Sequence, residues 1–282
     1  MTNPDMRIQF NNAVFNKKEV KLLFHEIAMI SGYLWQRGWA ERNAGNFSIN
    51  ITHLFSEKEL EKLTAYPFLP IQREYSDLAF QLFLVSRTGS KMRDIATDPV
   101  PHCCFIYISE TCTAYHIISN EPEDQTPKPT SELPTHLSVQ QLLLQKGAHD
   151  KVVLHTHAPE LISLTHLSGY KSAESINKLL WSMHPEVIVF VPDGVGFVPY
   201  GIPGTDRIAQ ATLKEFESHK VTLWEKHGCT AVAPSLTGAF DTIDILSKAA
   251  KIFFYCRWAG EEHERLKETQ LHEIKDHYAG LF

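Results

Sequence analysis

The stretch "DKVVLHTHAPELI" (residues 150–162) places two histidines two positions apart at the end of an apolar run. In a helix, the side chains of His155 and His157 would point about 200° apart and could not share a ligand. In a strand, residues i and i+2 face the same way, with Cα atoms roughly 6.5 Å apart. Two imidazole nitrogens can then reach one ion at about 2.0–2.1 Å each. We therefore predict a strand that ends in a pair of metal ligands.

Pro159 marks the point where this strand gives way to a helix. Proline is favoured at the first helical position, because its φ is already suited to a helix and its missing N–H would have no partner there. The preceding Val152, Val153 and Leu154 are strand formers. The order strand, His-x-His, helix turns the chain away from the two imidazoles and leaves a bound ion accessible.

A third ligand is needed, and His227 in "LWEKHG" is the best placed by local sequence, because it ends a strand-like run and precedes a glycine. His166 lies within the helix that follows Pro159, and His136 and His184 are less well placed. Three neutral histidines leave one coordination position open, which is the catalytic arrangement for zinc. Fe(II) sites prefer two histidines and a carboxylate, so zinc is the favoured metal.

Bulk properties exclude several classes of protein. The chain has 282 residues, 43% of them apolar and 21% charged, with a net charge of −6, so we expect a globular protein with no nucleic-acid partner. "MTNPDMRIQF" (residues 1–10) lacks the pattern of a signal peptide, and no apolar run approaches the ~20 residues of a membrane span. A reduced, cytoplasmic protein is expected, because no CxxC pair or disulfide-like spacing occurs among Cys103, Cys104, Cys112, Cys229 and Cys256.

Hydrophobic periodicity predicts one α/β domain over residues 1–282. A helical stripe within residues 17–40 is formed by Val20, Leu23, Ile27, Ile30 and Leu34. Further helices are expected at 56–63, 132–147, 204–220 (with Thr205 as N-cap) and from Leu236 onward, with a charged helical tail at 261–282. Strands are expected within 41–51, 80–86, 103–110, 113–119, 186–201 (two strands) and 221–233 (two strands). Because several strands follow one another without helices, the sheet is predicted to be mostly antiparallel or mixed.

Glu132 has two possible roles. It lies near the end of a proline-rich and acidic stretch (residues 120–134), at the start of a helix that Thr130 or Ser131 is expected to cap. A glutamate in the first helical turn complements the helix dipole by about 0.3–1 kcal/mol, and sequence alone favours this role. A carboxylate beside a Lewis-acid metal can also act as a general base.

Two polar turns, "RNAGNFS" (residues 42–48) and "RTGSK" (residues 87–91), contain groups that can cradle a phosphate. Neither fits a P-loop or a G-x-G-x-x-G pattern, and ordinary loops look the same, so nucleotide binding is not supported. No G-x-S-x-G motif is present. A lysine Schiff-base enzyme would leave the histidines without a role.

Taken together, these stretches resemble the class II aldolase/adducin family from about residue 20 to residue 258. The resemblance is carried by "GWAERNAGNFSI", "PTSELPTHL", "VVLHTHAPELISLTH", "VFVPDGVGFVP", "PGTDRIAQAT" and "LWEKHG". It implies a three-layer α/β/α sandwich around a mixed, mostly antiparallel sheet. It also implies a C4 homotetramer with active sites near the subunit interfaces and one Zn²⁺ per subunit.

The resemblance also implies roles for individual residues. His155, His157 and His227 match the metal ligands, and Glu132 matches the catalytic carboxylate. Glu186 matches a second carboxylate, offered across the subunit interface. The substrate phosphate is expected to be held by Asn43, Gly45, Asn46, Thr88, Gly89, Ser90 and Ser131.

The implied reaction is reversible retro-aldol cleavage of a phosphorylated ketose, L-rhamnulose 1-phosphate, to dihydroxyacetone phosphate and L-lactaldehyde. Glu132 would carry the proton of the enediolate carbon, and Glu186 or a water would accept the C4 hydroxyl proton. One alternative is an aldolase or epimerase of the same family acting on another phosphosugar, such as L-fuculose 1-phosphate. Others are a non-catalytic adducin-like binding module, which would not need these four residues, and a zinc hydrolase, which would not need the phosphate turns.

Overall fold

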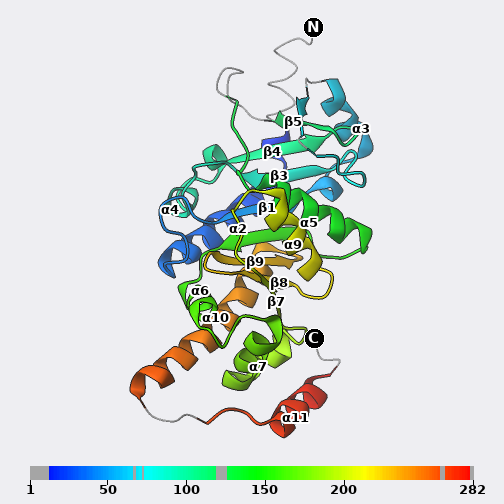
Figure 1. Cartoon of the computed structure of the whole chain (residues 1–282). Helices are drawn as coiled ribbons and strands as arrows, with labels where there is room; N and C mark the ends of the chain where they lie inside the picture. Colours follow the sequence, from blue (N-terminus) through cyan, green and yellow to red (C-terminus); the bar gives the residue numbers. More distant parts are fainter. Residues whose placement is uncertain (1–12, 66–67, 72, 119–125, 261–263, 280–282) are drawn as a thin grey trace.

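A nine-stranded sheet in the order β2-β5-β4-β3-β1-β6-β9-β8-β7 runs through the molecule (Figure 1). The structure is a computed structural model that describes residues 13–65, 68–71, 73–118, 126–260 and 264–279. Every neighbouring pair of strands is antiparallel except β7 and β8, which are parallel. The mixed, mostly antiparallel sheet is therefore confirmed. Its strands are β1 (Asn46–Asn50), β2 (Leu69–Pro70), β3 (Leu82–Ser86), β4 (Cys103–Ile108), β5 (Ala114–Ile118), β6 (Val152–Thr156), β7 (Val195–Val198), β8 (Val221–Trp224) and β9 (Gly228–Ala233).

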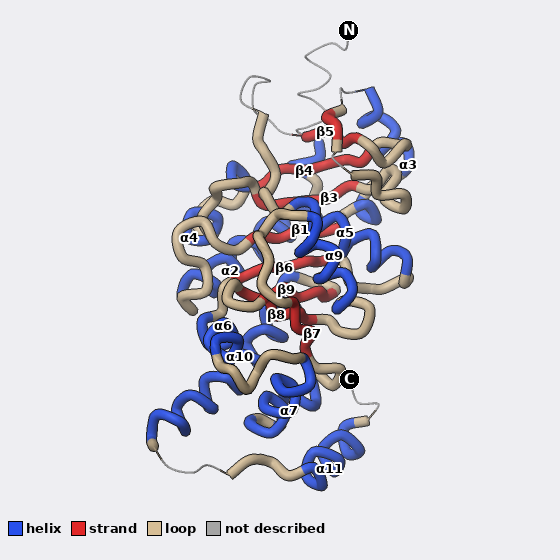
Figure 2. Tube along the Cα trace, in the orientation of Figure 1, coloured by secondary structure: helices blue, strands red, loops and turns tan. Residues whose placement is uncertain are grey.

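Helices cover both faces of this sheet, as expected for an α/β/α sandwich (Figure 2). One face carries α5 (Leu133–Gln145) and α9 (Asp206–Glu215). The other face carries α2 (Lys18–Gln36), α6 (Pro159–His166), α7 (Ala173–Met183) and α10 (Leu236–Ala259). Further helices are α3 (Glu57–Glu61), α4 (Met92–Ile95), α8 (Pro185–Phe190) and α11 (Glu268–Tyr278), and 3-10 helices lie at Thr52–Leu54, Lys62–Ala65 and Val100–His102.

The apolar stripe of α2 lies in the larger core, where α2 packs beside α10. Val20, Ile27, Ile30 and Leu34 are fully buried, whereas Leu23 is only partly buried. Burying each such aliphatic side chain stabilises the fold by about 1.5–3 kcal/mol. This packing holds the loop that follows α2 against the end of β6, where the paired histidines lie.

The strand expected at residues 186–191 is wrong, because Pro185–Phe190 forms the helix α8. A short run of apolar residues cannot distinguish a buried strand from a buried helix by periodicity. Pro185 decides the outcome at the first helical position, with His184 in the extended N-cap conformation. The second strand expected in this region is confirmed as β7.

The predicted cap of α5 also needs correction. The N-cap residue is Glu132 rather than Thr130 or Ser131, and the helix begins at Leu133. The hydroxyl oxygen of Thr130 instead accepts a hydrogen bond from the Glu132 backbone N–H at 3.3 Å. Glu132 is therefore not in the first helical turn. Thr205 is the N-cap residue of α9, as predicted, although its hydroxyl donates to the Ile202 carbonyl.

The two ends of the chain are described only in part. The charged tail contains α11, which has no buried residue, and Figure 1 shows it beside α7 at the far end from β5. Residues 1–10, where no signal peptide was recognised, and residues 120–125 of the proline-rich stretch lie outside the described residues. Among the described helices, none combines the length and the apolar character that crossing a membrane requires.

Candidate active site and metal centre

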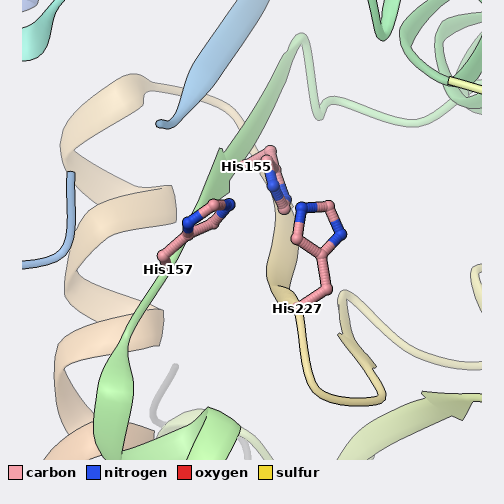
Figure 3. Close-up of side chains that lie close together, drawn as sticks. All are labelled: His155, His157 and His227. Atoms are coloured by element: carbon pink, nitrogen blue, oxygen red, sulfur yellow. The ribbon is translucent and has the colours of Figure 1, made fainter. Parts of the chain in front are cut away.

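Three histidines converge at the end of β6 (Figure 3). His155 is in β6, His157 is one residue beyond it, and His227 is in the turn between β8 and β9. Each offers a ring nitrogen, and these nitrogens all lie within 4.8 Å of one another. Among the described residues, this is the cluster of histidine, cysteine and carboxylate groups suited to hold a metal ion. The predicted pair and its predicted third member therefore meet in space.

The register of the sheet brings His227 to the other two histidines. Antiparallel pairing of β6 and β9 places Cys229 opposite Thr156, so the turn before β9 lies beside the end of β6. In this turn Lys226 has a φ of 60°, and its backbone N–H donates to the Thr165 hydroxyl at 2.8 Å. These contacts fix the direction from which His227 enters the site.

His155 has the hydrogen bonding of a metal ligand. Its Nδ1 lies 3.0 Å from the Cys229 carbonyl oxygen and 3.2 Å from the Thr230 hydroxyl. Because a carbonyl only accepts, Nδ1 carries the proton and Nε2 has a free lone pair. This Nε2 is buried and has no hydrogen-bond partner among the described residues. A buried bare nitrogen facing two other imidazoles fits a bound cation.

His157 and His227 complete the same arrangement. The Nδ1 of His157 donates to a carboxylate oxygen of Glu41 at 2.8 Å, which leaves Nε2 bare, and the Nδ1 of His227 is buried without a partner. Burial is the main reason that the pKa of His155 falls well below its usual value, and the neighbouring imidazoles add to the effect. Burial also lowers the pKa of His227 to about 4, with a smaller contribution from His157. The rings of His155 and His227 are therefore neutral at pH 7, as metal ligation requires.

The loop between α2 and β1 supplies Glu41, which the sequence analysis did not identify. The carbonyl oxygen of Trp39 accepts hydrogen bonds from the His157 backbone N–H at 2.9 Å and from the Thr156 hydroxyl at 2.8 Å. These two bonds attach the loop to the end of β6 and bring Glu41 to His157. A carboxylate on the second nitrogen of a metal-binding histidine fixes the ring and makes it a better ligand.

Glu132 lies beside the three histidines. Its Oε2 is 3.8 Å from the Nε2 of His155 and accepts a hydrogen bond from the Asn46 Nδ2 at 3.1 Å. The side chain is buried, and this burial raises the pKa of the carboxyl group, although the bond from Asn46 opposes the shift. A raised pKa makes it easier for a carboxyl group to hold a proton that it can later return.

A cavity of about 150 Å³ joins the carboxylate, the histidines and both polar turns. It is lined by Asn43, Ala44, Gly45, Asn46, Arg87, Thr88, Gly89, Thr130, Ser131, Glu132, His155, His157 and His227. Ten of the twelve predicted site residues therefore line one cavity, and the two others, Ser90 and Glu186, do not. Arg87 was not among the predicted residues, although this residue begins the turn "RTGSK" and brings a fixed positive charge.

Ser90 and Glu186 make contacts elsewhere. The Ser90 hydroxyl donates to the His102 carbonyl at 3.3 Å. Glu186 is in the first turn of α8, half-exposed, and its carboxylate lies 2.7 Å from the Nδ1 of His184. The other histidines considered as ligands are also outside the cluster: His136 is a buried residue of α5, and His166 ends α6.

A larger cavity of about 610 Å³ lies between α7, α8 and the tail helix α11. Its size does not make it the active site, because the histidine cluster and Glu132 are not among its lining residues. The smaller cavity contains the groups capable of acid–base and metal chemistry.

Comparison with known proteins identifies the family. Residues 25–254 match the model of the Class II Aldolase and Adducin N-terminal domain. The chain belongs to this family. This class II aldolase is 38% identical to a rhamnulose-1-phosphate aldolase of Bacteroides thetaiotaomicron, over 89% of this chain and 91% of the relative. It is 34% identical to a rhamnulose-1-phosphate aldolase of Klebsiella pneumoniae, over 77% of this chain and 79% of the relative.

Solved structures agree with this assignment. The class II aldolase fold is shared with a sugar-phosphate aldolase from Thermotoga maritima, at a TM-score of 0.71 and 27% identity, covering 87% of this chain and 99% of that structure. An L-fuculose 1-phosphate aldolase has the same fold at a TM-score of 0.57, with 16% identity and coverage of 91% and 96%. The chain is thus an enzyme of the lyase class with a three-histidine cluster able to bind a metal.

Proposed function

We propose that this class II aldolase uses zinc to cleave L-rhamnulose 1-phosphate reversibly into dihydroxyacetone phosphate and L-lactaldehyde. The observation that carries the proposal is the position of Glu132, 3.8 Å from His155 in a cavity that also contains the two phosphate-type turns. The rhamnulose-1-phosphate aldolases that match most of the chain support the choice of sugar.

His155, His157 and His227 would hold the ion, and three neutral imidazoles are a ligand set typical of catalytic zinc. Bound there, zinc would supply a Lewis acid for the negative charge that develops on the substrate oxygens. Glu41 and the Cys229 carbonyl keep His157 and His155 in the tautomers that leave Nε2 free.

Glu132 would carry the proton that the reaction moves at carbon. In the cleavage direction, breaking the C3–C4 bond leaves an enediolate, and the protonated Oε1 or Oε2 of Glu132 returns a proton to its carbon. In synthesis, the carboxylate removes that proton from dihydroxyacetone phosphate. Burial raises the pKa of this group, which suits an acid that must also act as a base.

The phosphate would lie against the two turns at the other side of the cavity. Backbone N–H groups and polar side chains of Asn43, Gly45, Thr88, Gly89 and Ser131 line it there. Arg87 is in the same lining, and its guanidinium, which also donates to the Pro101 carbonyl oxygen, would complement the phosphate charge.

The assembly is also a proposal. We expect a homotetramer in which Glu186, half-exposed and outside the cavity of its own subunit, is offered to the cavity of a neighbour as the group that accepts the C4 hydroxyl proton. The whole chain is expected to act as one domain. A reducing compartment such as the cytoplasm is expected, because all five cysteines are free.

The test is release of dihydroxyacetone phosphate from L-rhamnulose 1-phosphate, with L-fuculose 1-phosphate alongside. Release should stop when a chelator removes the metal and return when zinc is restored. Glu132→Gln should bind zinc normally but cleave slowly. If zinc-loaded protein releases product from neither sugar, the proposal is wrong, whereas preference for fuculose 1-phosphate would correct the substrate alone.

A further inference from the structure

A buried chain of polar side chains leads from the middle of α5 to Glu132. The Gln140 Nε2 lies 3.1 Å from the Ser48 hydroxyl, and that hydroxyl lies 2.9 Å from the Nδ1 of His136. The Nε2 of His136 lies 2.5 Å from the Asn46 Oδ1. The Asn46 Nδ2 then lies 3.1 Å from the Glu132 Oε2. Buried polar groups of this kind are retained where each is satisfied by a partner.

When Glu132 is ionised, the chemistry of these groups fixes the direction of every hydrogen bond. An ionised carboxylate only accepts, so the amide nitrogen of Asn46 must face Glu132 and its oxygen must face His136. The Nε2 of His136 therefore carries a proton. Burial lowers the pKa of His136 to about 3, so the ring is neutral and its Nδ1 is bare. Nδ1 accepts from Ser48, whose oxygen accepts from Gln140, and each donor in the chain points toward Glu132.

The far end of this chain is anchored to the backbone. The amide nitrogen of Gln140 also donates to the Lys151 carbonyl oxygen at 3.0 Å, and both Gln140 and His136 are about 1% exposed. Because Gln140 and His136 are on α5 while Ser48 and Asn46 are on β1, the chain connects the helix to the sheet directly behind the active site.

We infer that His136 is a positioning residue that, through Asn46, holds the Glu132 carboxylate beside the metal-binding histidines. This inference rests on the proposed function. Without the donor at Nε2, the Asn46 amide can rotate and bring its oxygen to Glu132, where two acceptors repel. Asn46 would then have this role in addition to the phosphate-binding role expected from the sequence, because its oxygen and one of its N–H groups already bond within the protein.

Substitutions at His136 test the inference. His136→Phe removes both ring nitrogens at similar size, whereas His136→Gln keeps a donor that can reach Asn46. The control is Thr135→Val, because the buried Thr135 hydroxyl has no hydrogen-bond partner among the described residues. For zinc-loaded protein we measure kcat and KM for the ketose phosphate, zinc affinity, and exchange of the carbon-bound proton of dihydroxyacetone phosphate with D₂O by NMR.

We expect His136→Phe to lower kcat and the exchange rate by about 10²-fold, the scale for a small misplacement of a catalytic group, with KM and zinc affinity little changed. His136→Gln should recover most of the loss, and Thr135→Val should behave as wild type. Equal losses in the Phe and Gln variants, or wild-type exchange in His136→Phe, would overturn the inference. If His136→Phe does not fold, Ser48→Ala takes its place and should lower kcat and the exchange rate by a smaller factor. A wild-type exchange rate in Ser48→Ala would then overturn the inference.

A second measurement separates this inference from the proposed function. The ¹⁵N shifts of the His136 ring, identified by their absence in His136→Gln, report which nitrogen carries the proton. We expect a neutral ring protonated at Nε2 at pH 7, whether or not the protein cleaves rhamnulose 1-phosphate. A ring protonated at Nδ1 overturns the inference even if the aldolase is active.

Discussion

Gly228 lies directly against the backbone carbonyl oxygen of Thr156. A Cβ atom at position 228 would be 2.5 Å from that oxygen, and 3.0 Å from ring carbons of both His155 and His157. Contacts of 2.5 Å do not occur between a real Cβ and a backbone oxygen, so either the turn or the end of β6 would have to shift. The glycine after His227 is thus a condition for the three histidines to meet.

Gly228→Ala should therefore separate the ligands and weaken zinc binding by at least about tenfold, the lower end of the effect of disturbing a ligand's surroundings. Zinc affinity is measured by competition with a chromophoric chelator. Gly169→Ala is the matched control, because nothing lies within 4 Å of a Cβ built at that glycine. Unchanged affinity in Gly228→Ala would contradict the proposed ligand set.

Glu41 should strengthen zinc binding without touching the ion. Its carboxylate accepts from the Nδ1 of His157 at 2.8 Å, and loss of such a partner typically costs 10–100-fold in metal affinity. We expect Glu41→Ala to lower zinc affinity by about that factor and Glu41→Gln, which keeps an acceptor oxygen, to lower it less. Glu57→Gln, a substitution in α3, serves as the control. Equal affinities in all three variants would show that His157 needs no partner.

Zinc should raise the thermal stability of the protein. A ligand that binds the folded state alone stabilises it by about 4.1 kcal/mol when present at 1,000 times its Kd. Tm is expected to rise with zinc and to fall again with a chelator. In His227→Ala the rise should be small, whereas His166→Ala, at an exposed histidine outside the cluster, should keep it. An equal rise in both variants would place the zinc elsewhere.

Acid should remove the contribution of the capping box at the start of α3. Hydrogen bonds from the Ser56 backbone N–H and hydroxyl lower the pKa of Glu59 to about 2 from the usual 4.5. A lowered folded-state pKa means that this stabilisation is complete above pH 4.5 and is lost as the pH falls toward 2. The difference in free energy of unfolding between wild type and Glu59→Gln, from urea titrations, should shrink between pH 6 and pH 3. Glu57→Gln, a substitution in the same helix outside the capping box, is the control.

Local sequence was enough to predict the parts of the site that depend on neighbouring residues. The two-residue spacing of His155 and His157 works only on extended backbone, and proline is favoured at the first helical position, where Pro159 begins α6. For the same reason the hairpin over residues 221–233 and the helix from Leu236 were predicted from turn residues and periodicity. Local sequence failed at Pro185–Phe190, where a short apolar run suits either a strand or a helix.

What the sequence by itself determined is therefore the kind of chemistry: a pair of imidazoles on one strand, a helix that turns away from them, and polar turns suited to a phosphate. The tertiary structure decided which distant groups complete the site. His227 joins the pair through the register of β6 and β9, Glu41 reaches His157 across 116 positions, and His136 reaches Asn46 across 90. Local propensities contain no information about such pairs, because strand register and helix packing are set by burial over the whole core.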